Sequence, residues 1–402
     1  MKVLSFGTYP IRIPVHGGQR RTSQIGEAYT RGGIEYRYVC VYDAASYGGA
    51  SVGSLDLAFA PDRVAPSPVP FIGDIASGHF AADDALAFDH FAGLCEAFGP
   101  DVLQVEQPFM WPLVRKLRGT GACTNTALVY SSHNFEGPLK RAILEGVGVD
   151  PEQAAVNEDV VTGLEAELAA EADLLICVSE SDADHYRRLA PDCAPLVIRN
   201  GTERPQAAKR PPHGQVLTLN DYLFFVGSAY PPNIAGFETF VLRSGLYGFP
   251  PLKRFAICGG AANGIYQSQL YAPHSEAYGA RAQFFPSPSD AELVWLRDNA
   301  KAILLPIATG GGSNLKTAEA LTSGKWIVAT PLAMRSFEEF IDSSGIIIAP
   351  TAEAFHRAMV RVLHEAPLRL TPTQQKARES LYWDRLLAEG GLAERVQALK
   401  VG

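Results

Sequence analysis

Short hydrophobic runs alternate with longer amphipathic stretches along nearly the whole chain, and this alternation constrains the fold more than any other feature. Nearly continuous runs of about four to eight apolar residues are typical of strands that are covered on both faces. We expect strands at residues 2–8, 35–42, 102–106, 127–132, 173–179, 196–199, 222–226, 254–258, 301–305, 326–329 and 345–348. Helical patterns lie between them, for example at 81–98, 152–171 and 352–365. The order predicts an α/β protein with parallel sheets and helices on both faces.

The alternation breaks once, in the proline-containing stretch 202–217, and then restarts. With 402 residues, the chain also exceeds the roughly 250–300 residues at which one hydrophobic core stops growing. We therefore expect two doubly wound, Rossmann-like domains that face a cleft, with ligands at the carboxyl ends of the strands. The expected boundaries are 1–203 for the first domain, 204–218 for a linker, 219–372 for the second domain and 373–402 for a C-terminal helix. Residues 44–78 are interpreted as an elaborated loop.

Charge and cysteine content exclude several classes of function. The formal net charge is −8, which does not suit a protein that mainly binds nucleic acid. The six cysteines are scattered and form no CxxC pair, so we expect reduced thiols rather than a disulfide framework or a zinc site. The N-terminus is typical of a strand rather than of a signal peptide, and no apolar run reaches the ~18 residues of a membrane span. These features predict a cytoplasmic protein, with a peripheral contact at the inner face of the membrane left open.

The strongest candidate site follows the predicted strand 301–305. Gly310, Gly311 and Gly312 come just before a helix that we expect to begin at Ser313, which is a good N-cap. Glycines let backbone N–H groups approach an anion, and a helix start adds positive charge. A lysine and a glutamate in the first turns, Lys316 and Glu319, suit the phosphates and sugar hydroxyls of a nucleotide diphosphate.

Two other interpretations of this segment compete. The glycines could form only a tight turn, with the lysine and glutamate as a surface pair. The stretch from Gly310 to Thr317 also resembles a P-loop, but Leu315 stands where that motif has the glycine before its lysine. We therefore favour a diphosphate site without P-loop chemistry, which includes Asn314.

Further candidates follow the first strands of both domains. Gly17 and Gly18 form a turn before a helix that carries Arg20 and Arg21, and arginines there suit a phosphate or carboxylate. They could equally be solvated surface residues. In the second domain, Gly227, Ser228 and Asn233 follow the strand 222–226, where turn residues leave backbone donors exposed. For these three residues, ligand contact and turn formation are equally compatible with the pattern.

His133 and Asn134 come directly after the strand 127–132, where active-site residues gather in such folds. A histidine there can donate a hydrogen bond to a sugar hydroxyl or phosphate, or act as a base. It could also be a structural residue. Glu136 is either another polar contact or the first-turn acid of the next helix. The acidic pair Asp182 and Asp184 resembles a metal-binding motif, but capping of a helix explains it, so we expect no metal.

The ordered motifs HGGQRR, YSSHN, ADLLICVSESDADHY, VIRNGTE, LFFVGSAYPPN and AILLPIATGGGSNLKTAEALTSGKWIVAT extend over essentially the whole chain. Together with the final YWDRL, they resemble a GT-B glycosyltransferase of family 4. The resemblance implies two Rossmann-like domains, a donor sugar nucleotide bound mainly by the second, and a last helix that crosses back to the first. It also implies a UDP- or GDP-linked donor and no cofactor.

By position, the resemblance implies roles for several residues. Glu319 matches the glutamate that binds the ribose, and the segment from Gly310 to Ser313 matches the diphosphate loop. His133 matches a histidine near the transferred sugar, and the pair Gly17 and Gly18 matches the glycine loop of the first domain. The first of the family's two glutamates would fall at Gly311 and is absent. The basic residues expected near Ser228 are also absent, and we infer that Lys316 supplies their charge.

These features predict a retaining, metal-independent glycosyltransferase that moves a sugar from a nucleotide-diphosphate sugar to a hydroxyl of a glycan, a lipid-linked molecule or a small molecule. His133, Lys316 and Glu319 are the expected catalytic residues. The alternatives are a non-catalytic nucleotide-sugar-binding protein of the same fold and a sugar-nucleotide epimerase or hydrolase.

Overall fold

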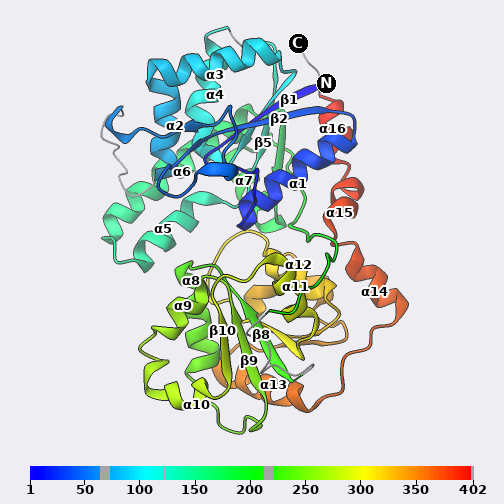
Figure 1. Ribbon diagram of the computed structural model, residues 1–402. Helices are drawn as coiled ribbons and strands as arrows, with labels where there is room; N and C mark the ends of the chain where they lie inside the picture. Colours follow the sequence, from blue (N-terminus) through cyan, green and yellow to red (C-terminus); the bar gives the residue numbers. More distant parts are fainter. Residues whose placement is uncertain (64–72, 122, 212–220, 400–402) are drawn as a thin grey trace. The chain divides into compact units, whose positions relative to one another are not determined.

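The computed structural model describes residues 1–63, 73–121, 123–211 and 221–399. By its internal contacts the chain forms two compact units. The first unit comprises Met1–Arg199, Gly311–Ser313 and Asp384–Gly402, and the second comprises Asn200–Gly310 and Asn314–Trp383. Both units are built on a parallel sheet, which confirms the expected α/β class (Figure 1).

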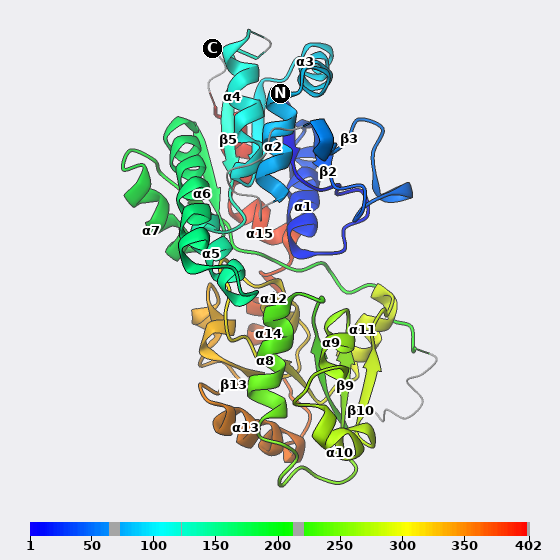
Figure 2. The ribbon, with the colours of Figure 1, turned by 90° about the vertical axis from the view of Figure 1, so that its left-hand side faces the viewer.

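The first unit is built on a seven-stranded sheet in the order β3-β2-β1-β4-β5-β6-β7. Its strands are β1 (Lys2–Gly7), β2 (Glu35–Tyr42), β3 (Leu57–Ala58), β4 (Val102–Glu106), β5 (Ala127–Ser131), β6 (Leu174–Cys177) and β7 (Leu196–Val197). Its helices are α1 (Gly17–Arg31), α2 (Gly73–Asp83), α3 (Ala85–Phe98), α4 (Trp111–Gly119), α5 (Glu136–Gly146), α6 (Pro151–Glu171), α7 (Glu180–Leu189), α15 (Trp383–Glu389) and α16 (Leu392–Gln397). Figure 2 shows α2, α3 and α4 gathered beside the sheet.

The two faces of this sheet differ in polarity near its centre. Because side chains alternate along a strand, Leu103 and Val105 of β4 lie on one face, where α2, α3 and α4 complete a large apolar core. Gln104 and Glu106 lie on the opposite face, and both are fully buried. On that face Tyr29 of α1 donates a hydrogen bond to Gln104 at 2.7 Å. The sheet therefore carries a buried polar layer under α1.

Several expected elements have other boundaries. The helix expected at 81–98 is two helices, because the Asp84 side chain accepts a hydrogen bond from the Ala87 N–H and caps α3 anew. The short strand β3 and the strand β10 (Ala282–Phe285) were missed. The expected loop at 44–78 contains β3 and the beginning of α2, and its residues 64–72 lie outside the described part of the chain.

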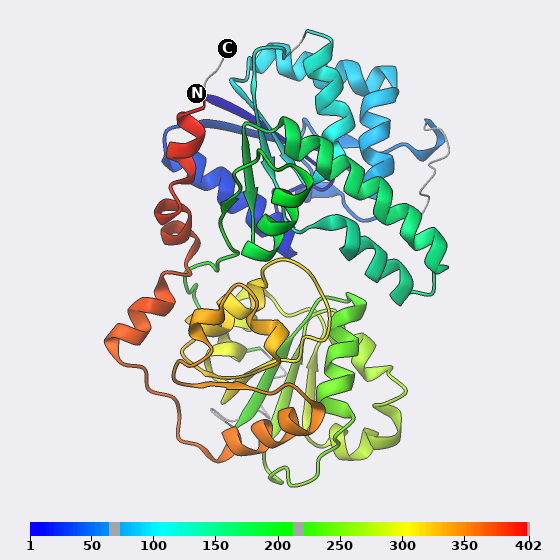
Figure 3. The same ribbon diagram turned by 180° about the vertical axis from the view of Figure 1, so that it is seen from behind.

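The C-terminal segment is three short helices, α14 (Pro372–Glu379), α15 and α16, instead of the single long helix we expected. The helical hydrogen bonds stop before α15 because Thr202 pairs with the backbone of Leu381 and Trp383, at 2.9 Å in each case. A second break falls at Gly390 and Gly391. The last of the three helices, α16, lies along α1 in the first unit (Figure 3).

The second unit has a six-stranded sheet in the order β10-β9-β8-β11-β12-β13. The strands besides β10 are β8 (Tyr222–Val226), β9 (Arg254–Cys258), β11 (Ala302–Leu305), β12 (Trp326–Ala329) and β13 (Ile346–Ile348). The helices besides α14 are α8 (Pro231–Phe237), which continues into a π-helical turn (Glu238–Leu242), and α9 (Ala261–Tyr266), α10 (Ser275–Gly279), α11 (Asp290–Asp298), α12 (Leu315–Thr322) and α13 (Ala352–His364).

Both faces of the second sheet are apolar. Leu223 and Phe225 of β8 belong to a core with α8, α9 and α13, whereas Phe224 belongs to a core with α11 and α12. A strand buried on both faces needs the continuous hydrophobic pattern seen in the sequence. No helix among the described residues is long and apolar enough to cross a membrane. The expected linker 204–218 is irregular up to residue 211, and its remainder lies outside the described residues.

Candidate functional site

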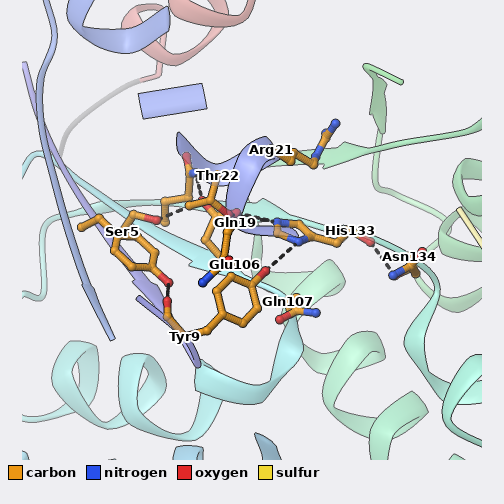
Figure 4. A network of polar contacts seen from close by, with 12 residues as sticks. Ser5, Tyr9, Gln19, Arg21, Thr22, Glu106, Gln107, His133 and Asn134 are labelled. Carbon is orange, nitrogen blue, oxygen red and sulfur yellow. Dashed lines mark hydrogen bonds and ion pairs between the residues drawn. The ribbon is translucent and has the colours of Figure 1, made fainter. Parts of the chain in front are cut away.

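His133 lies at the carboxyl edge of the first sheet, two residues beyond β5, and 6% of its surface is exposed. Its Nε2 atom lies 2.9 Å from the Glu106 carboxylate, at the end of the neighbouring strand β4. Its Nδ1 atom lies 3.1 Å from the Tyr9 hydroxyl, which follows β1. Both ring nitrogens are therefore engaged, one by a side chain of strand β4 and the other by a side chain of the loop after β1 (Figure 4).

The glycine turn before α1 lies against this histidine. A Cβ atom on Gly18 would collide with the Tyr9 hydroxyl and would lie 3.4 Å from Nδ1 of His133. The absence of a side chain at position 18 thus lets the first turn of α1 approach both residues. His16 caps this helix, since its side chain accepts a hydrogen bond from the Gln19 N–H at 3.5 Å. The structure brings together the predicted Gly17–Gly18 turn and the predicted His133.

The Glu106 carboxylate is held from several sides. Ser5 donates to Oε1 at 3.0 Å, and the Gln104 amide donates to the same oxygen. Burial opposes ionisation of this carboxyl, but the hydrogen bonds from His133 and Gln104 lower the pKa of Glu106 below its usual value. Burial, followed by the charge of Glu106, raises the pKa of Tyr9 well above its usual value, so the Tyr9 phenol keeps its proton.

A second polar cluster lies next to His133 along the sheet edge. Asn134 and Gln107 each donate a side-chain amide hydrogen bond to Oε1 of Glu136, at 3.1 and 3.3 Å. Glu136 is buried and is the first residue of α5, as its interpretation as the first-turn acid of that helix requires, and its contact to a ligand stays a prediction. Gln107 has φ +66°, which is rare for a residue other than glycine, and such strain gathers at functional sites.

An ion pair lies at the end of β1. Lys140 of α5 contacts Asp74 of α2 at 2.9 Å, and Thr8 donates to the same carboxylate at 2.9 Å. Burial alone would raise the pKa of Asp74, but the nearby Lys140 ammonium lowers it. Besides the imidazole of His133, this edge of the first unit therefore offers hydroxyl, amide, carboxylate and ammonium groups.

Arg21 lies elsewhere than the sequence suggested. It is only 1% exposed, and its guanidinium donates to the Ile198 carbonyl at 2.9 Å inside the first unit. Burial lowers the pKa of Arg21 to about 10, and the charge of Glu106 partly opposes this change. This burial does not support the expected contact with a phosphate.

In the second unit, Lys316 lies at the carboxyl edge of the sheet, in the first turn of α12. Its ammonium donates to the side-chain oxygen of Asn233 in α8, and Asn233 in turn donates to Ser228 at 3.1 Å. Burial lowers the pKa of Lys316 to about 8, and Glu319, one turn along the same helix, partly opposes this change. Three residues predicted from two separate motifs, Ser228 and Asn233 from one and Lys316 from the other, thus form one hydrogen-bonded group.

Glycines shape the backbone around this group. A Cβ atom on Gly227 would lie 3.1 Å from that of Asn233, so residue 227 lets the turn after β8 pack closely on α8. Gly310 and Gly312 have φ values of +136° and +61°, which favour glycine, and the carbonyl of Gly310 accepts a hydrogen bond from Arg335 at 2.6 Å. Glycines are therefore required by the bend itself at these two positions.

The start of α12 differs from the expectation. The helix begins at Leu315 rather than at Ser313, and its N-cap is Asn314, whose side chain accepts from the Lys316 N–H at 3.1 Å. Ser313 is buried instead. Asparagine is as good a cap as serine. Gly312, two residues before Asn314, has a positive φ, and this bend in the backbone brings Asn314 to the start of the helix. The described residues contain no group of three or more His, Cys, Asp or Glu side chains arranged to hold a metal.

Sequence reasoning missed Tyr9, Glu106 and Gln107. Tyr9 and Gln107 stand in loops and carry no motif. Glu106 ends an apolar strand, VLQVE, in which Gln104 and Glu106 stand two residues apart and so share one face. Two polar residues on one face of an otherwise apolar strand were the available signal of the buried polar layer.

Known proteins resemble the chain in part of its sequence and in its fold. The family model of the glycosyl transferase 4-like domain matches residues 16–201. Among solved structures, HepE of Anabaena in complex with UDP and glucose has a TM-score of 0.65 at 14% identity, covering 99% of this chain and 100% of that one. Sucrose-phosphate synthase from Thermosynechococcus elongatus has a TM-score of 0.64 at 15% identity, covering 99% and 94%.

A third solved structure, WaaG, a glycosyltransferase involved in lipopolysaccharide biosynthesis, has a TM-score of 0.55 at 12% identity and covers 100% of both chains. At these identities the structural likeness shows the shared GT-B fold alone. A search of curated protein sequences finds no match.

Proposed function

We propose that the chain is a glycosyltransferase, since its residues 16–201 match the model of the glycosyl transferase 4-like domain, and that it moves a sugar from a UDP- or GDP-linked donor to a hydroxyl of a glycan or lipid-linked acceptor. The transfer retains the anomeric configuration and requires no metal. HepE was solved with UDP and glucose, and WaaG takes part in lipopolysaccharide biosynthesis, which supports the proposed classes of donor and acceptor.

The observation that carries this proposal is the position of the Lys316 ammonium. It stands in the first turn of α12, on a side-chain oxygen of Asn233, beside the glycine bend that contains Gly310. A cation and a helix start together bind the leaving diphosphate and stabilise the negative charge that develops on it. Glu319, one turn further along α12, accepts hydrogen bonds from the ribose hydroxyls.

The first unit contributes its own carboxyl edge in this proposal. His133 contacts a hydroxyl of the transferred sugar, and the Gly17–Gly18 turn brings backbone N–H groups to the same region. Gly311 stands where the family has its first glutamate, so the contact of that glutamate side chain to the donor sugar is missing.

Nucleotide binding tests the proposal directly. UDP, GDP and their sugar conjugates are screened by thermal shift, and the best ligand is then titrated by calorimetry. Lys316→Met and Glu319→Gln should each weaken its binding about tenfold or more, whereas Lys376→Met, a lysine on the exposed surface of α14, should leave binding unchanged. Unchanged binding in both site variants would refute the assigned roles.

Product analysis separates the alternatives. A labelled donor incubated with and without glycan acceptors gives a glycosylated product for a transferase, but free sugar or an isomer for a hydrolase or epimerase. Binding without any turnover would favour a non-catalytic protein, for which Gly311 is the best support. NMR of the product gives the anomeric configuration, and activity that survives chelation of divalent ions would support a metal-independent reaction.

A further inference from the structure

We infer that Glu106 is a positioning residue that holds His133 as the neutral Nε2–H tautomer, so that Nδ1 is an acceptor, and that a substrate hydroxyl donates to Nδ1 in place of the Tyr9 hydroxyl. The substrate group at His133 is then a hydrogen-bond donor, and a phosphate or carboxylate does not fit there. The tautomer follows from the structure of the first unit alone, while the statement about substrate rests on the proposed transferase function.

The Glu106 carboxylate receives hydrogen bonds at both of its oxygens. Oε1 of Glu106 receives two hydrogen bonds, from the Ser5 hydroxyl at 3.0 Å and from the Gln104 amide. These donors leave Oε2 for His133, whose Nε2 lies 2.9 Å away. An ionised carboxylate only accepts hydrogen bonds, so Nε2 must carry the proton that it donates.

The proton on Nε2 determines the role of the other ring nitrogen of His133, Nδ1. When Nε2 of a neutral imidazole is protonated, Nδ1 is an acceptor, because the partner of one nitrogen sets the state of the other. The Tyr9 hydroxyl lies 3.1 Å from Nδ1 and retains its proton, so it donates to Nδ1. The close approach of Gly18 to the same nitrogen places Nδ1 at the first turn of α1.

The two partners of His133, Glu106 and Tyr9, differ in whether a substrate group can take their place. Glu106 is fully buried and belongs to the polar layer of the sheet, so its hydrogen bond to His133 is permanent. Tyr9 stands in the loop after β1 and is 8% exposed, and in this proposal its hydroxyl is the partner whose place a substrate hydroxyl takes. Two other groups lie beside these residues. The Thr22 hydroxyl lies 3.5 Å from Nε2 of His133, and the His16 ring contacts the Tyr9 ring edge to face.

The Glu106→Gln variant gives a sharp test because the surrounding donors dictate how the new amide is oriented. Ser5 and Gln104 both donate to the position of Oε1, so the amide oxygen must stay there and the NH2 group must face His133. The NH2 group then donates to Nε2, and His133 becomes the Nδ1–H tautomer. The variant is nearly isosteric and keeps the hydrogen-bond count, so we expect it to fold.

The tautomers are read from long-range ¹H–¹⁵N correlation spectra of histidine-labelled protein at about pH 8, above the ordinary imidazole pKa near 6.5. The chain has nine histidines, and comparison with His133→Gln identifies the signals of residue 133. Wild type and Tyr9→Phe should both show the Nε2–H tautomer, and Glu106→Gln should show the Nδ1–H tautomer. An Nδ1–H or doubly protonated His133 in wild type overturns the inference, whatever reaction the protein catalyses.

The substrate statement has a separate test once the donor is known. A donor whose hydroxyl at the His133 position is replaced by fluorine cannot donate to Nδ1, so wild type should bind it about tenfold or more weakly than the parent donor. In Glu106→Gln, Nδ1–H faces the ligand and this discrimination should shrink. Equal discrimination in both proteins, with the tautomers as expected, would refute the substrate statement and leave the tautomer and the transferase proposal standing.

Discussion

Donor binding should depend on pH through Lys316. Burial lowers the pKa of this lysine from its usual 10.5 to about 8 in the free protein, whereas a bound diphosphate holds the ammonium in its charged form. Near pH 7 the Lys316 side chain of the free protein is already mostly protonated, so the affinity for the donor should change little with pH there through this lysine. Above pH 8 each bound ligand must bring a proton with it, and the affinity should fall about tenfold per pH unit.

The size of the Lys316 contribution follows from its chemistry. A hydrogen bond from a charged group to an anion contributes roughly 1.5–3 kcal/mol, which is about 10- to 150-fold in affinity. We expect Lys316→Met to lose this factor near pH 7 and to lose the dependence on pH above 8 as well, because it has no group that titrates there.

Isothermal titration calorimetry in two buffers of different ionisation heat measures both the affinity and the proton uptake. Wild type should take up close to one proton per ligand near pH 9 and almost none near pH 7. Proton uptake that persists in Lys316→Met would show that another group titrates, and a flat profile for wild type would refute the assigned position of the diphosphate.

Three further predictions concern stability. A Cβ at Gly78 would overlap a backbone carbonyl of the segment after β4, so Gly78→Ala should destabilise the protein by about 1–3 kcal/mol in urea unfolding, whereas Gly93→Ala, on an exposed and open helix position, should be neutral or slightly stabilising. Glu165 accepts hydrogen bonds from two backbone N–H groups at the start of α5, at 2.8 and 3.0 Å, so Glu165→Gln should cost about 1–3 kcal/mol by the same measurement, and the exposed Glu167→Gln under about 0.5. Burial lowers the pKa of His16 to about 4, so the unfolded chain binds an extra proton between about pH 6.5 and 4, and the folded state loses stability as the pH falls through that range. The His16→Asn variant keeps the helix cap and should reduce this loss. The measurement is the drop in Tm between neutral pH and about pH 5, which should be smaller in the variant.

Strands that are buried on both faces could be predicted well from the sequence. The runs at Val102–Glu106 and Tyr222–Val226 have the predicted boundaries, because a nearly continuous apolar run has few other solutions. The strand Ala282–Phe285 was missed because AQFF is short and follows exposed polar residues. Helix ends were less accurate, since a cap such as Asp84 or Asn314 depends on a single hydrogen bond that periodicity does not show.

The candidate site was predictable only in part. Loops that follow strands gave His133 and Lys316, because polar residues at that place in an α/β fold point to a site. The role of Glu106, and the contact between Lys316 and the predicted Asn233, required knowledge of which strands are neighbours. Glu106 and His133 are 27 residues apart, and only the pairing of β4 with β5, with Glu106 opposite Ser131, brings them together.

The placement of α16 bears on how the protein is made. This helix packs on α1, where Gln397 donates to the Gly32 carbonyl at 2.9 Å, and the first unit thus combines residues 1–199 with the late helices α15 and α16. Domains usually fold in the order in which the ribosome releases them. Here the earlier-synthesised unit remains incomplete until α15 and α16 have been made, while the second unit can fold beforehand. A chain cut short after α14 would therefore damage the part made first.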